Sequence, residues 1–143
     1  MNLVLDTNIV VSGIIWRGPP HELFERVLAG EATAWTCAEL HTELLQVLNY
    51  PKLRGLFDAR DLDPAKIAER YAALCRWVRI APLAKPICRD PQDDRVLACA
   101  LVARADALVS GDDDLLSLRA VEELPILTAV ECLQRLAAGK PTL

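Results

Sequence analysis

The chain begins with the stretch MNLVLDTNIVVSGI, residues 1–14, in which three polar residues interrupt an apolar run. Residues 3–5 are typical of a short buried strand, and Asp6, Thr7 and Asn8 follow it directly. A carboxylate beside a hydrophobic core is costly unless another group compensates its charge. The stretch therefore predicts either a loop with a helix cap, or a catalytic or metal-binding carboxylate at the end of a strand.

The length and composition favour one soluble globular domain spanning residues 1–143. Hydrophobic residues make up 52% of the sequence and charged residues 25%, which is typical of a globular protein. No apolar run reaches transmembrane length. The N-terminus lacks the pattern of a signal peptide, because Asp6 interrupts it too early. We therefore expect a cytoplasmic protein with no membrane association.

Negative charge is concentrated in one part of the sequence. Residues 90–114 contain seven aspartates and two arginines, a net charge of −5, whereas the whole chain has a net charge of −4. Such a concentration indicates either a solvated acidic loop or a cation site. The basic patch of an avid nucleic-acid binder is absent from the sequence. None of the five cysteines has C-x-x-C spacing, so neither a disulfide framework nor a zinc site is predicted.

Short apolar runs alternate with segments of helical periodicity along the chain. We expect strands at residues 3–5, 32–36, 78–81, 107–109 and 126–127, and helices at residues 9–15, after Pro19, before Pro51, after Asp63, near Asp93 and after a capping box at Thr128–Glu131. This alternation predicts a parallel α/β sandwich. Functional groups in such sheets lie beyond the carboxyl ends of the strands, where Asp6 and Asp112 are expected.

Four acidic residues are candidates for a shared site: Asp6, Glu43, Asp94 and Asp112. Each also has a structural interpretation. Asp6 fits a solvated loop residue and Glu43 a helix-surface residue. Asp94 fits an acid in the first turn of a helix, and Asp112 fits a turn residue. Glu39, one helical turn before Glu43, is a rival candidate. Together, however, two strand-end acids and two helical acids are the oxygen ligands that Mg²⁺ or Mn²⁺ requires.

Other chemistries lack their components. His21 and His41 are the only histidines, and the sequence pairs neither with a nucleophile and an orienting acid. No glycine-rich phosphate-binding motif is present. Two types of phosphotransfer domain are disfavoured. A receiver domain needs paired acids after its first strand, and residues 2–5 offer none beside Asp6. A dehalogenase-type enzyme needs an acid two residues after its nucleophile, where this chain has Asn8.

Four stretches, VLDTNIVVSGI, ELHTELLQVL, CRDPQDDRVLACAL and ALVSGDDDLL, occur in the order and spacing of PIN-domain nucleases. The chain most resembles the bacterial and archaeal toxin components of toxin–antitoxin systems that are related to VapC. The resemblance implies a three-layer α/β/α sandwich with a central parallel sheet of about five strands. It also implies a metal-dependent ribonuclease.

The acids of the family fall on particular residues of this chain. The resemblance implies catalytic and metal-binding roles for Asp6, Glu43, Asp94 and Asp112. Asp93 remains an alternative to Asp94, because the two are adjacent. Thr7, Asn8 and Ser110 would hydrogen-bond to the ligands or to the scissile phosphate, and Asp114 matches a further acid of the family.

The expected activity is therefore Mg²⁺- or Mn²⁺-dependent endoribonuclease activity that hydrolyses RNA phosphodiester bonds. The resemblance further implies a homodimer and a small antitoxin protein as partner. Two alternatives stay open: a catalytically inactive PIN-like binding module, and a DNA-directed nuclease.

Overall fold

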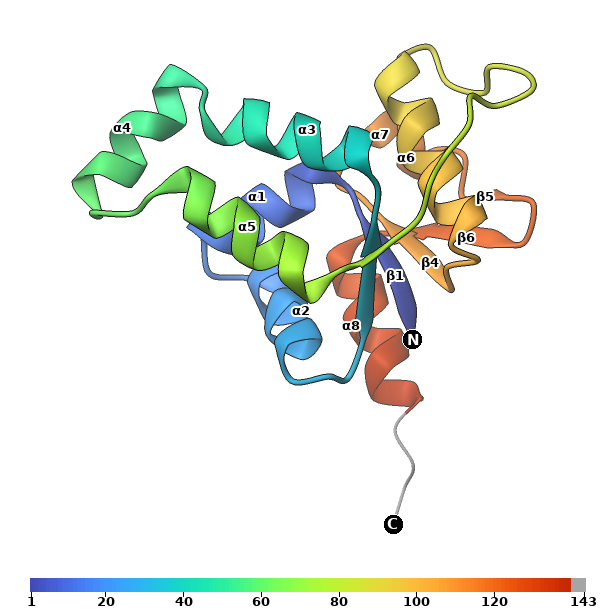
Figure 1. Ribbon diagram of the computed structural model, residues 1–143. Coiled ribbons are helices and arrows are strands. Elements are labelled where there is room, and N and C mark those ends of the chain that lie inside the picture. Colours follow the sequence, from blue (N-terminus) through green and yellow to red (C-terminus); the bar gives the residue numbers. More distant parts are fainter. Residues whose placement is uncertain (140–143) are drawn as a thin grey trace.

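The computed structural model describes residues 1–139 and shows an α/β fold built around one mixed, mostly parallel sheet (Figure 1). Within these residues the sheet has six strands in the order β3-β2-β1-β4-β6-β5. The strands are β1 (Asn2–Leu5), β2 (Thr33–Thr36), β3 (Arg76–Trp77), β4 (Ala107–Val109), β5 (Ala120–Val121) and β6 (Leu124–Leu127). All neighbouring pairs are parallel except β5 and β6.

The described residues contain eight helices, and several begin with the local signals that the sequence carries. They are α1 (Thr7–Ile15), α2 (Pro19–Leu28), α3 (Ala38–Leu48), α4 (Pro51–Ala59), α5 (Pro64–Leu74), α6 (Pro91–Val102), α7 (Asp113–Leu116) and α8 (Ala129–Ala138). Proline begins α2, α4, α5 and α6, where its missing N–H costs nothing. The predicted capping box of Thr128 and Glu131 begins α8.

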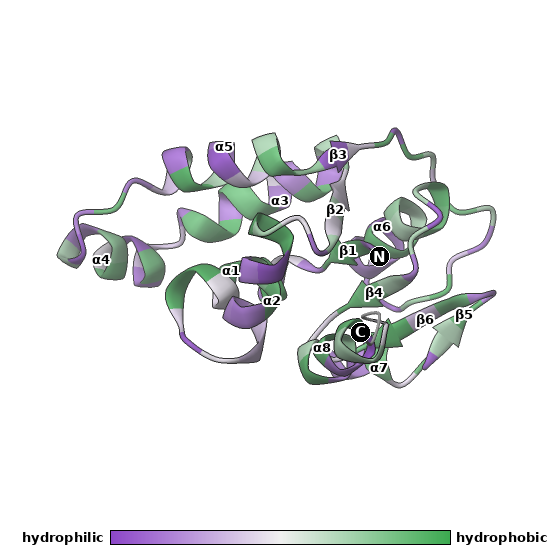
Figure 2. Cartoon of the chain, turned by 90° about the horizontal axis from the view of Figure 1, so that it is seen from below, coloured by the Kyte–Doolittle hydropathy of each residue, from purple (hydrophilic) through white to green (hydrophobic). Residues whose placement is uncertain are grey.

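The helices cover both faces of the sheet. Leu3 and Leu5 of β1 contribute to a core formed with α1, α2, α3, α4, α5 and α8, whereas Val4 contributes to a second core with α6 and α7. This division follows from the alternation of side chains along a strand. Hydrophobic residues are concentrated in the central strands, and hydrophilic ones lie on outward-facing helix turns such as those of α4 and α5 (Figure 2). The three-layer α/β/α prediction is therefore confirmed.

Some local expectations were wrong. Helix α1 begins at Thr7 rather than at Ile9, because Asp6 caps it. The strand expected at residues 78–81 is instead the two-residue β3 that precedes it. Helix α4 and the antiparallel strand β5 were not predicted. Pro51 follows the end of α3, as expected, but it also begins α4, which buries Phe57 against the core.

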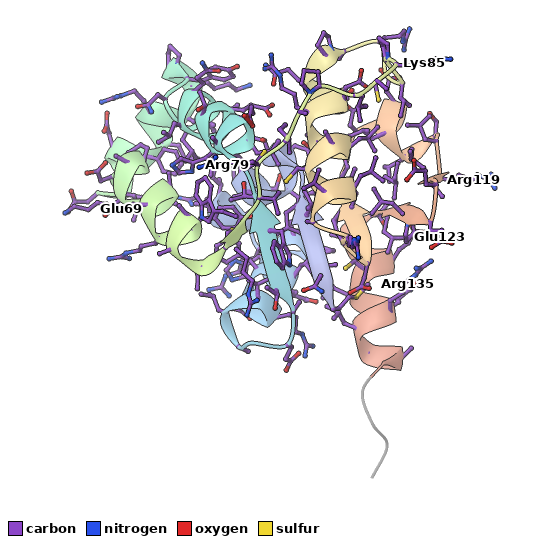
Figure 3. All side chains as sticks on the ribbon, turned by 45° about the vertical axis from the view of Figure 1, so that its right-hand side comes forward. Glu69, Arg79, Lys85, Arg119, Glu123 and Arg135 are labelled. Atoms are coloured by element: carbon purple, nitrogen blue, oxygen red, sulfur yellow. The ribbon has the colours of Figure 1, made fainter. Side chains whose placement is uncertain are left out.

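Charged side chains are spread over the surface away from the sheet. Figure 3 shows labelled charged side chains, including Glu69, Lys85 and Arg119, at the periphery of the molecule. A loop of residues 78–90 joins β3 to α6 and carries Lys85 at its outer edge. In residues 1–139, no helix combines the length and the apolar character that crossing a membrane requires.

Candidate metal centre

The candidate site lies where β1 and β4 end, with α3 on one side and α6 and α7 on the other (Figure 1). Parallel strands bring Asp6, which follows β1, and Asp112, which follows β4, to the same edge of the sheet. Helix α3 carries Glu43, and the first turn of α6 carries Asp93 and Asp94. The topology thus gathers acidic residues from four separate segments.

Asp6 is buried, and both of its carboxylate oxygens accept hydrogen bonds. Oδ1 accepts from the backbone N–H of Thr7 at 2.8 Å, and Oδ2 accepts from the hydroxyl of Ser110 at 2.7 Å. Burial raises the pKa of Asp6; the hydrogen bonds from Ser110 and Thr7 oppose this increase, and the negative charge of Asp112 adds to it. Asp6 is therefore a fixed, incompletely compensated carboxylate.

The turn after β4 is tied to the start of α1. The Ser110 hydroxyl oxygen accepts a hydrogen bond from the backbone N–H of Asp112 at 3.0 Å, and Asn8 Oδ1 accepts from the N–H of Gly111 at 3.3 Å. Asn8 therefore holds the neighbouring turn and does not cap its own helix. Asp112 caps α7 by accepting from the N–H of Asp114 at 2.8 Å.

Three carboxylates form what we call the acidic cluster: Asp93, Asp112 and Asp114, each of which offers one oxygen within 4.8 Å of the others. Asp93 is only 8% exposed. Burial, followed by the charges of Asp112 and Asp6, raises the pKa of Asp93 from 3.8 to about 6. An ion pair at 2.9 Å between the exposed side chains of Arg89 and Asp114 contributes positive charge at the rim.

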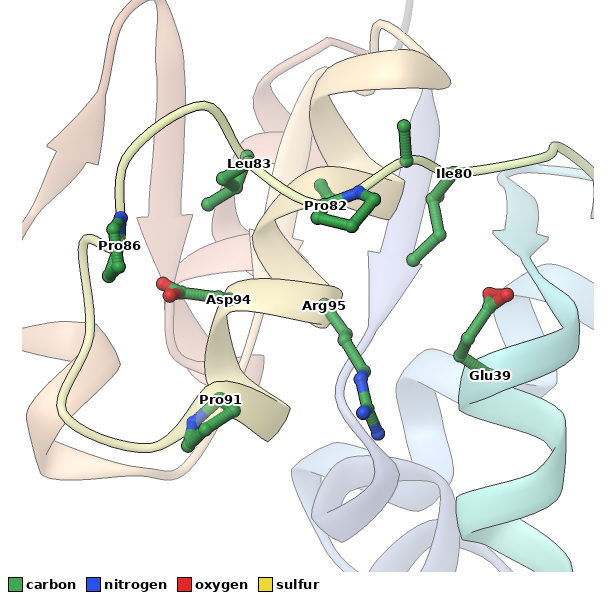
Figure 4. Close-up of a pocket in the computed structure, with 10 residues that line it drawn as sticks. Glu39, Ile80, Pro82, Leu83, Pro86, Pro91, Asp94 and Arg95 are labelled. Carbon is green, nitrogen blue, oxygen red and sulfur yellow. The ribbon is translucent and has the colours of Figure 1, made fainter.

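The structure brings Asp93, rather than Asp94, to the acidic cluster. The Asp94 carboxylate accepts hydrogen bonds from the backbone N–H groups of Cys88 at 2.8 Å and Ile87 at 3.2 Å. Figure 4 shows Asp94 extending from α6 toward the loop near Pro86. Successive residues of a helix point about 100° apart, so the two neighbours serve different parts of the molecule.

The sequence carries a signal that favours Asp93 over Asp94. Asp93 lies three and four residues before Val96 and Leu97, which are both buried, and residues at this spacing share one face of a helix. Asp93 is therefore on the inward face of α6. Asp90, for which the sequence leaves open a supporting role or a merely solvated position, caps α6 by accepting from the N–H of Gln92 at 2.9 Å, and its charge raises the pKa of both Asp93 and Glu43.

Glu43 faces the site from α3, whereas its rival Glu39 is exposed one turn earlier. Burial raises the pKa of Glu43; a hydrogen bond with the Thr7 side chain lowers it, Asp6 raises it, and Arg95 lowers it. Among residues 1–139, Glu43 Oε2 is the only buried side-chain oxygen or nitrogen without a hydrogen-bond partner. Buried polar atoms are normally satisfied, so this oxygen is available for a ligand.

The donor set has a clear chemical preference. The site offers carboxylate oxygens from the acidic cluster, with Asp6 and Glu43 beside them, and hard divalent cations such as Mg²⁺ and Mn²⁺ bind such oxygens. The raised pKa values of Asp6, Glu43 and Asp93 indicate charge that the protein alone does not neutralise. The residues present therefore fit a divalent cation.

Comparison with known proteins agrees with this architecture. Residues 2–114 match the family model described as the PIN domain. The fold resembles a chain in the crystal structure of VapBC2 from Rickettsia felis bound to a DNA fragment from their promoter, with a TM-score of 0.60 and 15% sequence identity. The similarity covers 90% of this chain and 98% of that one. No curated protein sequence matches. The family match extends over most of the length of this chain and includes the acidic residues of the candidate site. The chain therefore belongs to the PIN domain family.

Proposed function

We propose that the protein is a metal-dependent endoribonuclease that hydrolyses RNA phosphodiester bonds and acts as the toxin of a toxin–antitoxin pair. The observation that carries this proposal is the convergence of Asp6, Glu43 and the acidic cluster at one sheet edge of a PIN domain. A phosphodiester resists attack by an anionic nucleophile, and a site rich in carboxylates becomes useful for this chemistry once it holds cations.

The proposed ligands for Mg²⁺ or Mn²⁺ are Asp93, Asp112 and Asp114, with Asp6 and Glu43 beside them, directly or through water. Asp93 is proposed as a ligand in place of Asp94, because the Asp94 carboxylate accepts backbone hydrogen bonds from the 78–90 loop. A bound divalent ion would lower the pKa of water and stabilise charge that develops on the phosphate.

The other residues of the site hold these groups in position. The Ser110 hydroxyl donates a hydrogen bond to the Asp6 carboxylate and accepts one from the backbone N–H of Asp112, so it holds both acids in position. Thr7 supports Asp6 through its backbone and Glu43 through its side chain. Glu43, with its free oxygen Oε2, is suited to orient the attacking water and to accept its proton. Asn8 holds the turn that leads to Asp112.

A partner protein follows from the same chemistry. The Rickettsia felis structure contains VapBC2 bound to promoter DNA, and on this analogy we propose a small antitoxin as partner. The homodimer stays a prediction from the family resemblance. An arginine of the antitoxin could bridge two carboxylates of the acidic cluster. Co-expression with the product of a neighbouring open reading frame should yield a complex on size-exclusion chromatography whose inhibition weakens as salt or Mg²⁺ is raised. A neighbour that neither co-elutes nor inhibits would remove the antitoxin claim alone.

The nuclease proposal is tested with an RNA and a DNA oligonucleotide of the same sequence, labelled at the 5′ end. We expect cleavage of RNA with Mn²⁺ or Mg²⁺, no cleavage in EDTA, and little cleavage of DNA. Asp112→Asn should be inactive, whereas Asp58→Asn, an exposed aspartate of α4, should match wild type. Preferred cleavage of DNA would identify a DNA-directed nuclease, and cleavage of neither would favour a binding module.

A further inference from the structure

A pocket of about 370 Å³ lies between the 78–90 loop, the first turns of α6 and the start of α3 (Figure 4). Its walls are mainly aliphatic and proline side chains: Ile80, Pro82, Leu83, Pro86, Pro91 and Ala98. The volume lies near the lower end of the range of about 300–1,000 Å³ for small-ligand sites. It suits a single ring-sized group better than a peptide helix.

The loop that forms one wall is fixed in place. The carboxylate of Asp94, which also lines the pocket, accepts backbone hydrogen bonds from Ile87 and Cys88. The prolines at positions 82 and 86 restrict the backbone further. A wall held in this way is formed before a ligand arrives, which reduces the ordering cost of binding.

The pocket carries three charged side chains with distinct chemistry. Glu39 and Asp94 supply acceptor oxygens, and Arg95 is the only lysine or arginine lining the pocket in the part of the chain that the structure describes. Asp94 has oxygen lone pairs in addition to those that the loop uses, because a carboxylate can accept about four hydrogen bonds. The pocket thus combines an apolar interior, hydrogen-bond acceptors and one cation.

The pocket adjoins the candidate metal centre through two helices. On α3, Glu39 lines the pocket and Glu43 faces the centre one turn later; on α6, Arg95 lines the pocket two residues after Asp93. Arg95 is also near enough to Glu43 to lower its pKa, and Figure 4 shows its side chain extending between α6 and α3. A chain of nucleotides could therefore occupy both sites at once.

We propose that this pocket binds the nucleobase of a nucleotide next to the scissile phosphate, with Arg95 at that nucleotide's own phosphate and Glu39 or Asp94 accepting from a base amino group. The inference rests on the proposed ribonuclease function, for which it supplies a substrate subsite. An apolar slot suits the faces of a base, and acceptor oxygens select its donor groups. Guanine, adenine and cytosine carry an exocyclic amino group, whereas uracil does not.

Binding is tested without cleavage, in EDTA, by isothermal titration of the purified protein with GMP, AMP, CMP, UMP and ribose 5-phosphate. We expect the three amino-bearing nucleotides to bind about tenfold more tightly than UMP and ribose 5-phosphate, the discrimination that one well-formed base contact gives. Glu39→Gln should reduce this preference, and Arg95→Gln should lower the affinity for all five ligands. Equal binding of GMP and ribose 5-phosphate would overturn the proposal.

Two matched substitutions test the location. Ala81 and Ala84 are both exposed residues of the same loop, but only Ala81 lines the pocket. Ala81→Leu should weaken nucleotide binding at least fivefold, and Ala84→Leu should leave it unchanged. Ala98→Leu adds volume from the α6 wall and should also weaken binding, with folding checked by circular dichroism. If both pocket variants bind GMP like wild type, the pocket is not a nucleotide site and a protein partner becomes its expected occupant.

The outcomes separate this inference from the nuclease proposal. Nucleotide selectivity in EDTA, abolished by Ala81→Leu, would support the pocket even if no cleavage were detected. Cleavage of RNA without such selectivity would support the nuclease and reject the pocket.

Discussion

The hydroxyl of Ser110 donates a hydrogen bond of 2.7 Å to Oδ2 of Asp6, and it joins the ends of β1 and β4 across 104 positions of sequence. Ser110 is completely buried, and Asp6 is 6% exposed. The same hydroxyl oxygen accepts from the N–H of Asp112. One serine thereby sets the relative position of two of the acids on which the proposed chemistry depends.

Ser110→Ala should weaken both the fold and the site. The buried Asp6 carboxylate would lose one of its two hydrogen bonds, at a cost of about 1–3 kcal/mol in the free energy of unfolding. Metal affinity and RNA cleavage should decrease by roughly tenfold or more, as when supporting residues of metal sites are removed. Urea unfolding and cleavage assays measure the two effects. Ser12→Ala, in α1, is the control, and equal results for the two variants would contradict the proposed role.

Asp93→Asn and Asp94→Asn should have different consequences although the residues are adjacent. Asp93→Asn removes a charge from the acidic cluster and should abolish RNA cleavage while leaving the fold intact. Asp94→Asn weakens the acceptor for the N–H groups of Ile87 and Cys88 and should loosen the 78–90 loop. Hydrogen exchange of residues 78–90 should therefore increase in Asp94→Asn alone, with the cleavage rate at saturating RNA largely retained. If Asp94→Asn abolished cleavage and Asp93→Asn retained it, Asp94 rather than Asp93 would be the catalytic residue.

Stability of the metal-free protein should depend on pH through Asp93. Its pKa is raised from 3.8 to about 6, so the folded protein binds this proton more tightly than the unfolded chain. Its contribution to stability therefore decreases as pH rises from about 4 to about 6, and the loss is complete above that range. From pH 5 to pH 7.5 we expect Asp93 to account for a decrease of about 1 kcal/mol in the free energy of unfolding. Urea unfolding in EDTA should show a smaller decrease for Asp93→Asn than for wild type.

The fold was largely predictable from the sequence because its central features are local. Leu3 to Leu5 and Ala107 to Val109 are short apolar runs that end in polar residues, and both form the central strands of the sheet. The antiparallel β5 was not predictable in the same way. It has two residues, Ala120 and Val121, and its formation depends on pairing with β6 rather than on its own pattern.

The site was predictable only in part because side-chain direction depends on the final packing. The order of the acids and the strand-end positions of Asp6 and Asp112 could be obtained from sequence. The choice between Asp93 and Asp94 depends on which face of α6 packs against the sheet. The hydrogen bond from the Cys88 N–H to the Asp94 carboxylate depends on the conformation of a loop whose sequence has no regular pattern. The free oxygen of Glu43 likewise emerges only from the assembled structure.

Direct titration with Mn²⁺ at pH 7.5 tests the central claim, that the acidic cluster is a divalent metal site. Isothermal titration should show saturable binding to wild type and to Asp94→Asn, and affinity at least about tenfold lower for Asp93→Asn and Asp112→Asn. The melting temperature of wild type should rise with Mn²⁺ in proportion to this binding. Equal Mn²⁺ affinity in wild type, Asp93→Asn and Asp112→Asn, or no binding by wild type at millimolar Mn²⁺, would contradict the account.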